Sequence, residues 1–184
     1  MGVPSTSNVS VGQPKAGGGI FAAPAGTAIP ADAAAPLPAE FVGLGYVSDA
    51  GLVNTVATES NAVVAWGGDQ VLNARTSRTE TFKFSFIETN ENTMKQVYGA
   101  QNVSTGDKGL TVLHNSKSAT ASVYVFEILL GDKRAKRIVL GNAQVTELGD
   151  VSYLDGAAVG YEVTLTAFPD KNGNTAIEYI ASIA

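Results

Sequence analysis

Residues that could carry out catalysis are few in this sequence. His114 is the only histidine among 184 residues, and the chain has no cysteine. A serine or cysteine nucleophile needs a histidine base that a third group orients, and the sequence around His114 offers no such partner. Protein zinc sites use several histidine or cysteine ligands. We therefore expect His114 to be structural, and the chain to have no catalytic residue, metal site or cofactor.

The acidic residues suggest two further sites, and neither pattern is complete. Glu147, Asp150 and Asp155 could form the carboxylate pair of a hydrolase, whose two groups lie roughly 5–10 Å apart. The glycines beside them are instead typical of solvated turns. Residues 170–174 begin like a calcium-binding loop, but the glycine and the glutamate that complete such a loop are missing. A carboxylate-dependent hydrolase is therefore a weak alternative.

Two groups of residues have the character of contacts with a partner. Trp66 and Asp69 lie in a Trp-Gly-Gly-Asp turn, where a lone aromatic residue favours an interface over a sugar-stacking platform. Arg134 and Arg137 belong to a basic cluster over residues 133–137. Its members alternate between the two faces of a strand, so they form no single stripe for phosphates. We interpret both groups as contacts between subunits.

The composition excludes several classes of protein. The chain has 17 acidic and 12 basic side chains and a net charge of -5, whereas adhesive binding to duplex DNA depends on Lys and Arg. The absence of cysteine excludes a disulfide framework. The first twenty residues have no basic leader with an apolar stretch, and no apolar window reaches membrane-spanning length. We expect one domain that stays in the cytoplasm where it is made and contacts no membrane.

The chain divides near residue 40 into an arm and a body. Six of the seven prolines fall within the first 38 residues, which favours an extended, irregular segment over residues 1–40. This arm has few charges and several spaced apolar residues, which gain free energy by leaving water. We therefore expect it to dock on another subunit, and its deletion over residues 1–38 to leave a folded core that no longer stacks. The predicted contact residues are Val9, Val11, Ile20, Phe21, Ile29 and Leu37.

The body, residues 41–184, has the two-residue hydrophobic period of strands. One short helix is predicted from a cap at Asn90 to a stop at Gly99. A turn over residues 169–174 predicts a hairpin between residues 160–168 and 175–183. The fold class is mainly β: an antiparallel β-sandwich or open barrel with one flanking helix. The other expected strands are residues 79–88, 122–130 and 136–141, with shorter ones at 41–47, 51–56, 62–66 and 109–114.

A sheet-rich body joined to an apolar arm is typical of self-assembly. A free sheet edge readily pairs with a strand of another chain. A self-assembling protein can use such edges to join its subunits. If the rotation from one subunit to the next closes on itself, the subunits form a ring. A second contact that does not close stacks such rings into an open filament.

Several strings of residues also resemble a known family. They are residues 8–15, 21–27, 44–51, 66–69, 82–84, 97–99, 143–147, 160–164 and 169–170. In their order and spacing they resemble the major tail tube proteins of long-tailed, non-contractile bacteriophages, the siphoviruses. The resemblance implies a virion protein, made in the bacterial cytoplasm, whose hexameric rings stack into a tube that conducts viral DNA into the host.

The resemblance also implies partners and roles. The arm and an inter-strand loop over about residues 57–77, with Trp66 and Asp69, would bridge adjacent rings. The partners would be copies of the chain, a tape-measure protein inside the tube, and tail-terminator and distal tail or baseplate proteins at its ends. DNA would pass without sequence-specific contact.

Alternation along two strands gives the predicted lumen-lining side chains, which are Thr79, Thr81, Lys83, Ser85, Glu162, Thr164 and Thr166. The aromatic residues between them are expected in the core. The main rival is a monomeric carbohydrate-binding or adhesin-like β-sandwich, in which Trp66 would stack on sugar.

Overall fold

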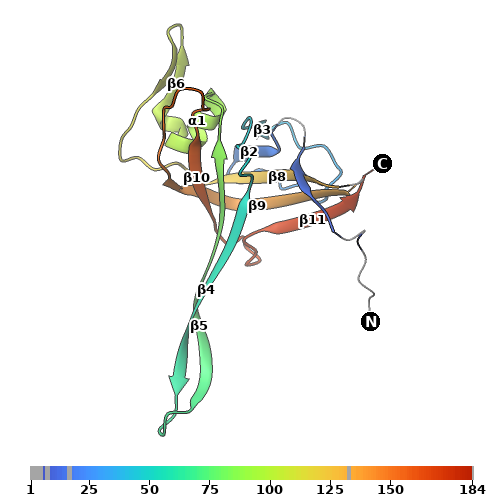
Figure 1. Cartoon of the computed structure of the whole chain (residues 1–184), viewed down its shortest axis with the longest axis vertical. Coiled ribbons are helices and arrows are strands. Elements are labelled where there is room, and N and C mark those ends of the chain that lie inside the picture. The colour runs from blue at the N-terminus through green and yellow to red at the C-terminus, as the bar shows by residue number, and fades with distance from the viewer. Residues whose placement is uncertain (1–5, 7–8, 16–17, 132–133, 184) are drawn as a thin grey trace.

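The computed structural model of the chain describes residues 6, 9–15, 18–131 and 134–183. Gly17 and Lys133, which the sequence analysis places in the arm and the basic cluster, lie outside these ranges. The fold is mainly β and antiparallel, and α1 (Glu91–Tyr98) is the only α-helix among the described residues (Figure 1). The strands are β1 Gly12–Pro14, β2 Ile20–Pro24, β3 Val42–Gly43, β4 Val53–Val64, β5 Gln70–Phe86, β6 Val103–Gly106, β7 Gly109–Val112, β8 Ser122–Leu130, β9 Arg134–Leu148, β10 Tyr161–Ala167 and β11 Ile177–Ser182.

Nine of these strands form one sheet. Its order is β3-β2-β8-β9-β10-β5-β4, while β1 pairs with β8 and β11 pairs with β9. The strands β6 and β7 form a separate hairpin. The long strands β8 and β9 therefore each have two shorter strands lying end to end along one edge.

The predicted hairpin between residues 160–168 and 175–183 is wrong. Strand β10 pairs with residues 143–148 of β9, and β11 pairs with residues 134–139 of the same strand. Asp170 closes the connecting loop, because its carboxylate accepts hydrogen bonds from the backbone N–H groups of Asn172 and Asn174, both at 2.8 Å. The loop returns the chain to the same edge of β9 without reversing its direction, so two strands continue along one long partner.

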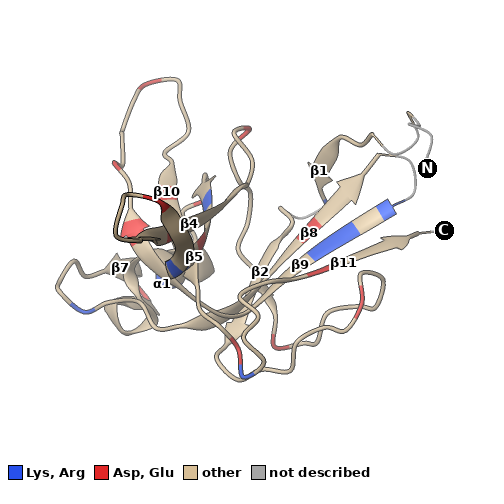
Figure 2. Cartoon of the chain, turned by 90° about the horizontal axis from the view of Figure 1, so that it is seen from below, with Lys and Arg blue, Asp and Glu red and all other residues tan. Residues whose placement is uncertain are grey.

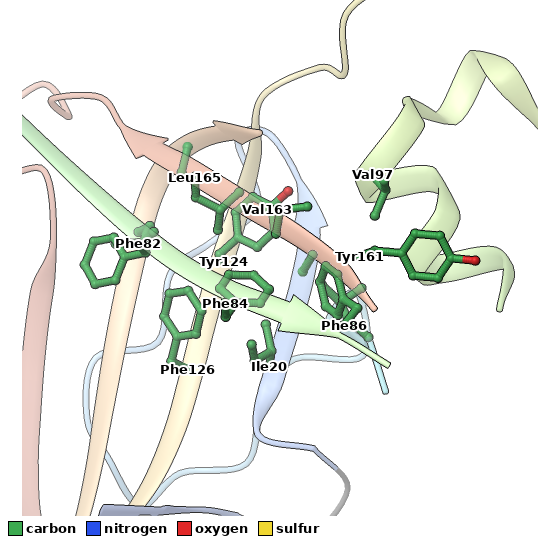
Figure 3. Packing of buried hydrophobic residues seen from close by; sticks show 14 of the residues in the cluster. Ile20, Phe82, Phe84, Phe86, Val97, Tyr124, Phe126, Tyr161, Val163 and Leu165 are labelled. Carbon is green, nitrogen blue, oxygen red and sulfur yellow. The ribbon is translucent and has the colours of Figure 1, made fainter. Parts of the chain in front are cut away.

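The sheet folds over so that β5 and β8 face each other across the core. Phe82 of β5 stacks on Phe126 of β8 with ring centroids 5.4 Å apart, and Phe84 meets the same ring edge to face (Figure 3). Two strands lie between β8 and β5 in the sheet order, so in a flat sheet these residues would be about 14 Å apart. The predicted core aromatic residues Phe82, Phe84, Phe86 and Tyr124 are all buried.

The helix α1 covers one end of this core as predicted. The Asn90 side chain accepts a hydrogen bond from the N–H of Thr93 at 2.9 Å, which caps the helix, and Gly99 ends it with a φ of 90°. Met94 and Val97 point into the main core.

A second, smaller core lies on the opposite face of β8 and β9. Val123, Val125 and Val139 of these strands pack against Phe41, with Phe21 and Leu37 beside them. Phe21 and Leu37 come from the segment predicted to be a docking arm, and Phe41 is the first residue after it. Residues 20–43 therefore fold onto their own subunit, and β2 supplies the buried Ile20, Ala22 and Ala23.

Arg137 fixes this segment to the sheet. Its side chain is 1% exposed and pairs with Glu127 of the neighbouring strand β8. Its two terminal nitrogens also donate to the backbone carbonyls of Asp32 and Ala35, at 2.7 and 2.8 Å. Figure 2 shows the basic residues of β9 beside the acidic residue of β8. Lys15 adds a second ion pair to Glu127 at 3.0 Å.

These contacts change the expectation for the arm. Deleting residues 1–38 would remove β2 and the carbonyl partners of Arg137, and would expose the second core. A folded core is therefore not the expected product of that deletion. Near the start of the arm, Val9 and Val11 remain exposed, at 78% and 70%.

The strands β4 and β5 extend far beyond the body as a two-stranded hairpin (Figure 1). The sequence predicts strands at 51–56 and 62–66, and the family resemblance implies a loop over about residues 57–77. In the structure, β4 and β5 are paired from Val53 with Lys83 to Val64 with Gln70, with register shifts after Glu59 and after Val63. No glycine or proline interrupts residues 52–64 or 70–86, so the backbone can stay extended to the Trp66 turn.

Candidate functional site

The register of β5 and β10 brings together the two predicted lumen-lining sets. Ser85 lies opposite Glu162, Lys83 opposite Thr164, and Thr81 opposite Thr166. Side chains directly opposite in a ladder share one face of the sheet. The residues between them, such as Phe84 and Val163, are buried on the other face. All seven predicted residues are at least partly accessible to solvent.

Neighbouring strands widen this surface. Thr55 of β4 lies opposite Thr81, and Glu147 of β9 lies opposite Thr164. The hydroxyls of Thr146 and Thr166 hydrogen-bond at 2.8 Å across a bulge in the ladder. We call this surface the polar face; its members are Thr55, Thr79, Thr81, Lys83, Ser85, Thr146, Glu147, Glu162, Thr164 and Thr166.

The polar face is dominated by neutral hydroxyl groups. Its lysine, Lys83, forms an ion pair with Glu162 at 2.8 Å. The nearest arginine along β5, Arg78, lies on the opposite face, where it donates to the Thr175 hydroxyl at 2.9 Å. Sequence alternation is sufficient to group Lys83 with Thr81 and Ser85 on β5, and Glu162 with Thr164 and Thr166 on β10. The ion pair follows only from the register between these two strands, which are distant in sequence.

A buried carboxylate fixes the root of the hairpin on that opposite face. Glu80 is 7% exposed and accepts hydrogen bonds from Thr175, from Arg78 at 2.9 Å and from Asn54 at 3.2 Å. Burial acts to raise the pKa of Glu80, but these three hydrogen bonds together outweigh it and hold the pKa below its ordinary value of 4.5. The cluster joins β4, β5 and Thr175, which lies two residues before β11.

Glu80→Gln is expected to destabilise the subunit at neutral pH and to have less effect in acid. A carboxyl group whose pKa is lowered by folding stabilises the folded state above its unfolded pKa, and this stabilisation is lost as the pH falls through the folded pKa. The expected loss at neutral pH is about 1–3 kcal/mol, the usual cost of a broken charged hydrogen bond. Urea unfolding of the unaltered chain and of the Glu80→Gln variant, at neutral pH and at a pH well below 4.5, measures this loss. An equal difference at both pH values would contradict this role of the Glu80 charge.

The residues predicted to contact other subunits fall into two groups. Trp66 and Asp69 occupy the tip of the hairpin, where Trp66 is fully exposed, and Val9, Val11 and Ile29 are also exposed. Ile20 and Arg137 are buried within the subunit, and Phe21 and Leu37 pack on the second core. Ile20 and Arg137 are therefore not at the surface that a subunit contact needs, whereas Phe21 and Leu37 remain partly exposed. Arg134 donates a hydrogen bond to Ser10 within the same chain.

The hairpin carries further exposed apolar residues that the sequence analysis does not single out. Near its tip, Val63 and Val64 of β4 and Val71 and Leu72 of β5 are 46–63% exposed. An exposed apolar group of this kind marks an interaction surface. The signal in the sequence is the pair of apolar runs on either side of the Trp66 turn, which a core strand would also show.

The candidate catalytic residues show no organised site. His114 is exposed and stacks on Tyr98 with centroids 4.5 Å apart. The pKa of Asp170 is lowered, first by the backbone N–H of Asn174, because its carboxylate closes the β10–β11 loop. In the described part of the chain, no three His, Cys, Asp or Glu side chains gather closely enough to hold a metal ion. Within the same ranges, no helix is both long and apolar enough to cross a membrane.

Comparison with models of protein families identifies the family of the chain. A family model described as phage tail tube protein matches residues 8–183 of the chain. This range includes every strand of the sheet, the polar face and the projecting hairpin. A search of curated proteins found no match.

Proposed function

We propose that the chain, which belongs to the phage tail tube protein family, forms hexameric rings that stack into the tube of a siphovirus-type tail and conduct DNA into the host. It is a structural component of the virion tail, and no catalytic step belongs to this role. The proposed partners are further copies of the chain, a tape-measure protein inside the tube, and terminator and distal tail proteins at its ends.

The projecting hairpin supports a contact between rings. Its distal residues are exposed along both strands and it ends in Trp66, so it contributes little to the core of its own subunit. An isolated two-stranded ribbon is marginal in water by itself. Burial of its apolar tip against a neighbouring copy would stabilise both the hairpin and the contact.

The polar face supports the lumen assignment. It is a broad surface of threonine and serine hydroxyls with Glu147 and Glu162 beside one paired lysine. DNA adheres to proteins mainly through Lys and Arg contacts with phosphates. A wall of neutral and acidic groups would therefore let the duplex pass with little adhesion. This arrangement is the observation that carries the proposal.

A single introduced cysteine tests both the tube and its lumen, because the natural chain has none. We expect Thr81→Cys to react with a small maleimide and with a bulky polymer-linked maleimide in the separate subunit. In assembled tubes, seen by electron microscopy, only the small reagent should react, because the bulky one cannot enter the lumen.

The Asp107→Cys variant, altered in the exposed turn between β6 and β7, is the control for the two reagents. In the separate subunit both maleimides should react with it. Equal reaction of the bulky reagent with the Thr81→Cys variant in tubes and in subunits would reject the lumen assignment. A chain that remains monomeric when concentrated and binds glycans would favour the carbohydrate-binding alternative.

A further inference from the structure

We propose that Glu162 prevents Lys83 from binding the phosphates of passing DNA. The ion pair then has a role beyond folding, because it removes the one cation that the polar face would otherwise offer to a polyanion. This inference rests on the proposed function, in which the polar face lines the tube.

The ion pair between Lys83 and Glu162 joins two neighbouring strands, β5 and β10. Lys83 lies opposite Thr164 and Glu162 opposite Ser85, so the two charged residues are diagonal neighbours on β5 and β10. Their charged atoms are 2.8 Å apart, with the side chains 52% and 47% exposed. Long side chains at diagonal positions can meet in this way. Both groups remain accessible to a ligand in solution.

The other basic residues of these strands point away from the polar face. Arg78 donates to Glu80 and Thr175 on the opposite face. Arg75 lies opposite Ser60, which is next to Glu59, and Glu59 is paired with Ser77 on the polar side. The register shifts between these two pairs, so Arg75 takes the face of Ser60 rather than that of Ser77. Alternation therefore places Arg75 on the opposite face as well. Among the described residues of β4, β5, β10 and the end of β9 beyond residue 142, Lys83 is the one cation on the polar face.

One unpaired lysine per subunit would matter because the subunits repeat. In a stack of rings, the same ammonium group recurs around and along the channel, and each can replace a counterion on a phosphate. A carboxylate at 2.8 Å holds the ammonium and repels phosphate. An exposed pair stabilises folding by only about 0–1 kcal/mol. Its loss should therefore change affinity for DNA more than stability.

The test compares tubes of the unaltered chain with tubes of Glu162→Gln. Open tubes are mixed with a short labelled duplex at low salt, treated with nuclease and sedimented, and the protected DNA is measured. We expect Glu162→Gln to raise the protected DNA by about three- to tenfold, with the gain disappearing as salt is added. The double variant Lys83→Gln/Glu162→Gln should return to the level of the unaltered chain.

Glu178→Gln is the matched control. Glu178 forms an equivalent surface pair with Lys136, also at 2.8 Å, outside the polar face. It should leave the protected DNA unchanged. No gain for Glu162→Gln, or a gain that Lys83→Gln does not remove, would overturn the proposal. Failure of Glu162→Gln alone to form tubes would also overturn it, because the pair would then serve assembly. Failure of the unaltered chain to form tubes would instead reject the proposed function.

Discussion

Shortening the β4–β5 hairpin is expected to abolish tube formation while the subunit stays folded. The variant replaces residues 60–76 by Asn-Gly, which joins the paired residues Glu59 and Ser77 through a two-residue turn. The removed residues are exposed, so the body loses no core contact. The apolar tip with Trp66, which we propose contacts the next ring, is absent in this variant.

Two measurements separate assembly from folding. Circular dichroism should show an unfolding temperature within a few degrees of that of the unaltered chain, since surface changes usually alter stability by less than about 0.5 kcal/mol. Electron microscopy and sedimentation should show no tubes. Point variants provide a matched comparison: Leu72→Ser in the hairpin and Leu113→Ser outside it change leucines that are 58% and 56% exposed. Tubes from the shortened chain would show that the hairpin is dispensable for assembly.

Arg137→Leu is expected to destabilise the subunit by about 3–5 kcal/mol, the cost of breaking a buried ion pair by removing one partner. The substitution leaves the Glu127 carboxylate buried and also leaves the carbonyls of Asp32 and Ala35 without their donor. Thermal unfolding should shift downward by about 6–20 °C for a domain of this size. The segment over residues 32–41 should become sensitive to protease, because Arg137 fixes it to the sheet.

The neighbouring residue Lys136 supplies the control. Lys136→Leu removes a cation from the same strand, but its pair with Glu178 lies at the surface. We expect the free energy of unfolding of this variant to change by no more than about 1 kcal/mol. Similar losses for both variants would show that Arg137 acts through the general charge of β9 rather than through its buried contacts.

The pattern of side chains along single strands is predictable from the sequence, because burial on one face imposes a period of two. Phe82 and Phe84 alternate with Thr81 and Lys83, and the structure confirms this division. The helix from Asn90 to Gly99 is equally local, since its cap and its stop are set by neighbouring residues. The predicted polar faces of β5 and β10 could thus be listed before the fold was known.

Pairing between distant strands is not predictable in the same way. Nothing local distinguishes a turn that reverses the chain from the Asp170 loop, which returns it to the same edge of β9. The arm shows a related limit. Its prolines predict irregular backbone, which is only partly correct, because β1 and β2 are strands that end at Pro14 and Pro24. Its apolar residues cannot show whether they cover their own subunit or another. Arg137 decides this point by binding the carbonyls of Asp32 and Ala35, and its partner Glu127 lies on another strand.

The separation of the hairpin tip from the folded body has an evolutionary consequence. If the tip contacts the next ring, as we propose, mutations near Trp66 are constrained less by the folding of their own subunit than by compatibility with other copies of the same chain. Lineages can therefore drift apart at the tip while retaining the same sheet. Two such lineages in one infected cell would fail to copolymerise and would build pure tubes side by side.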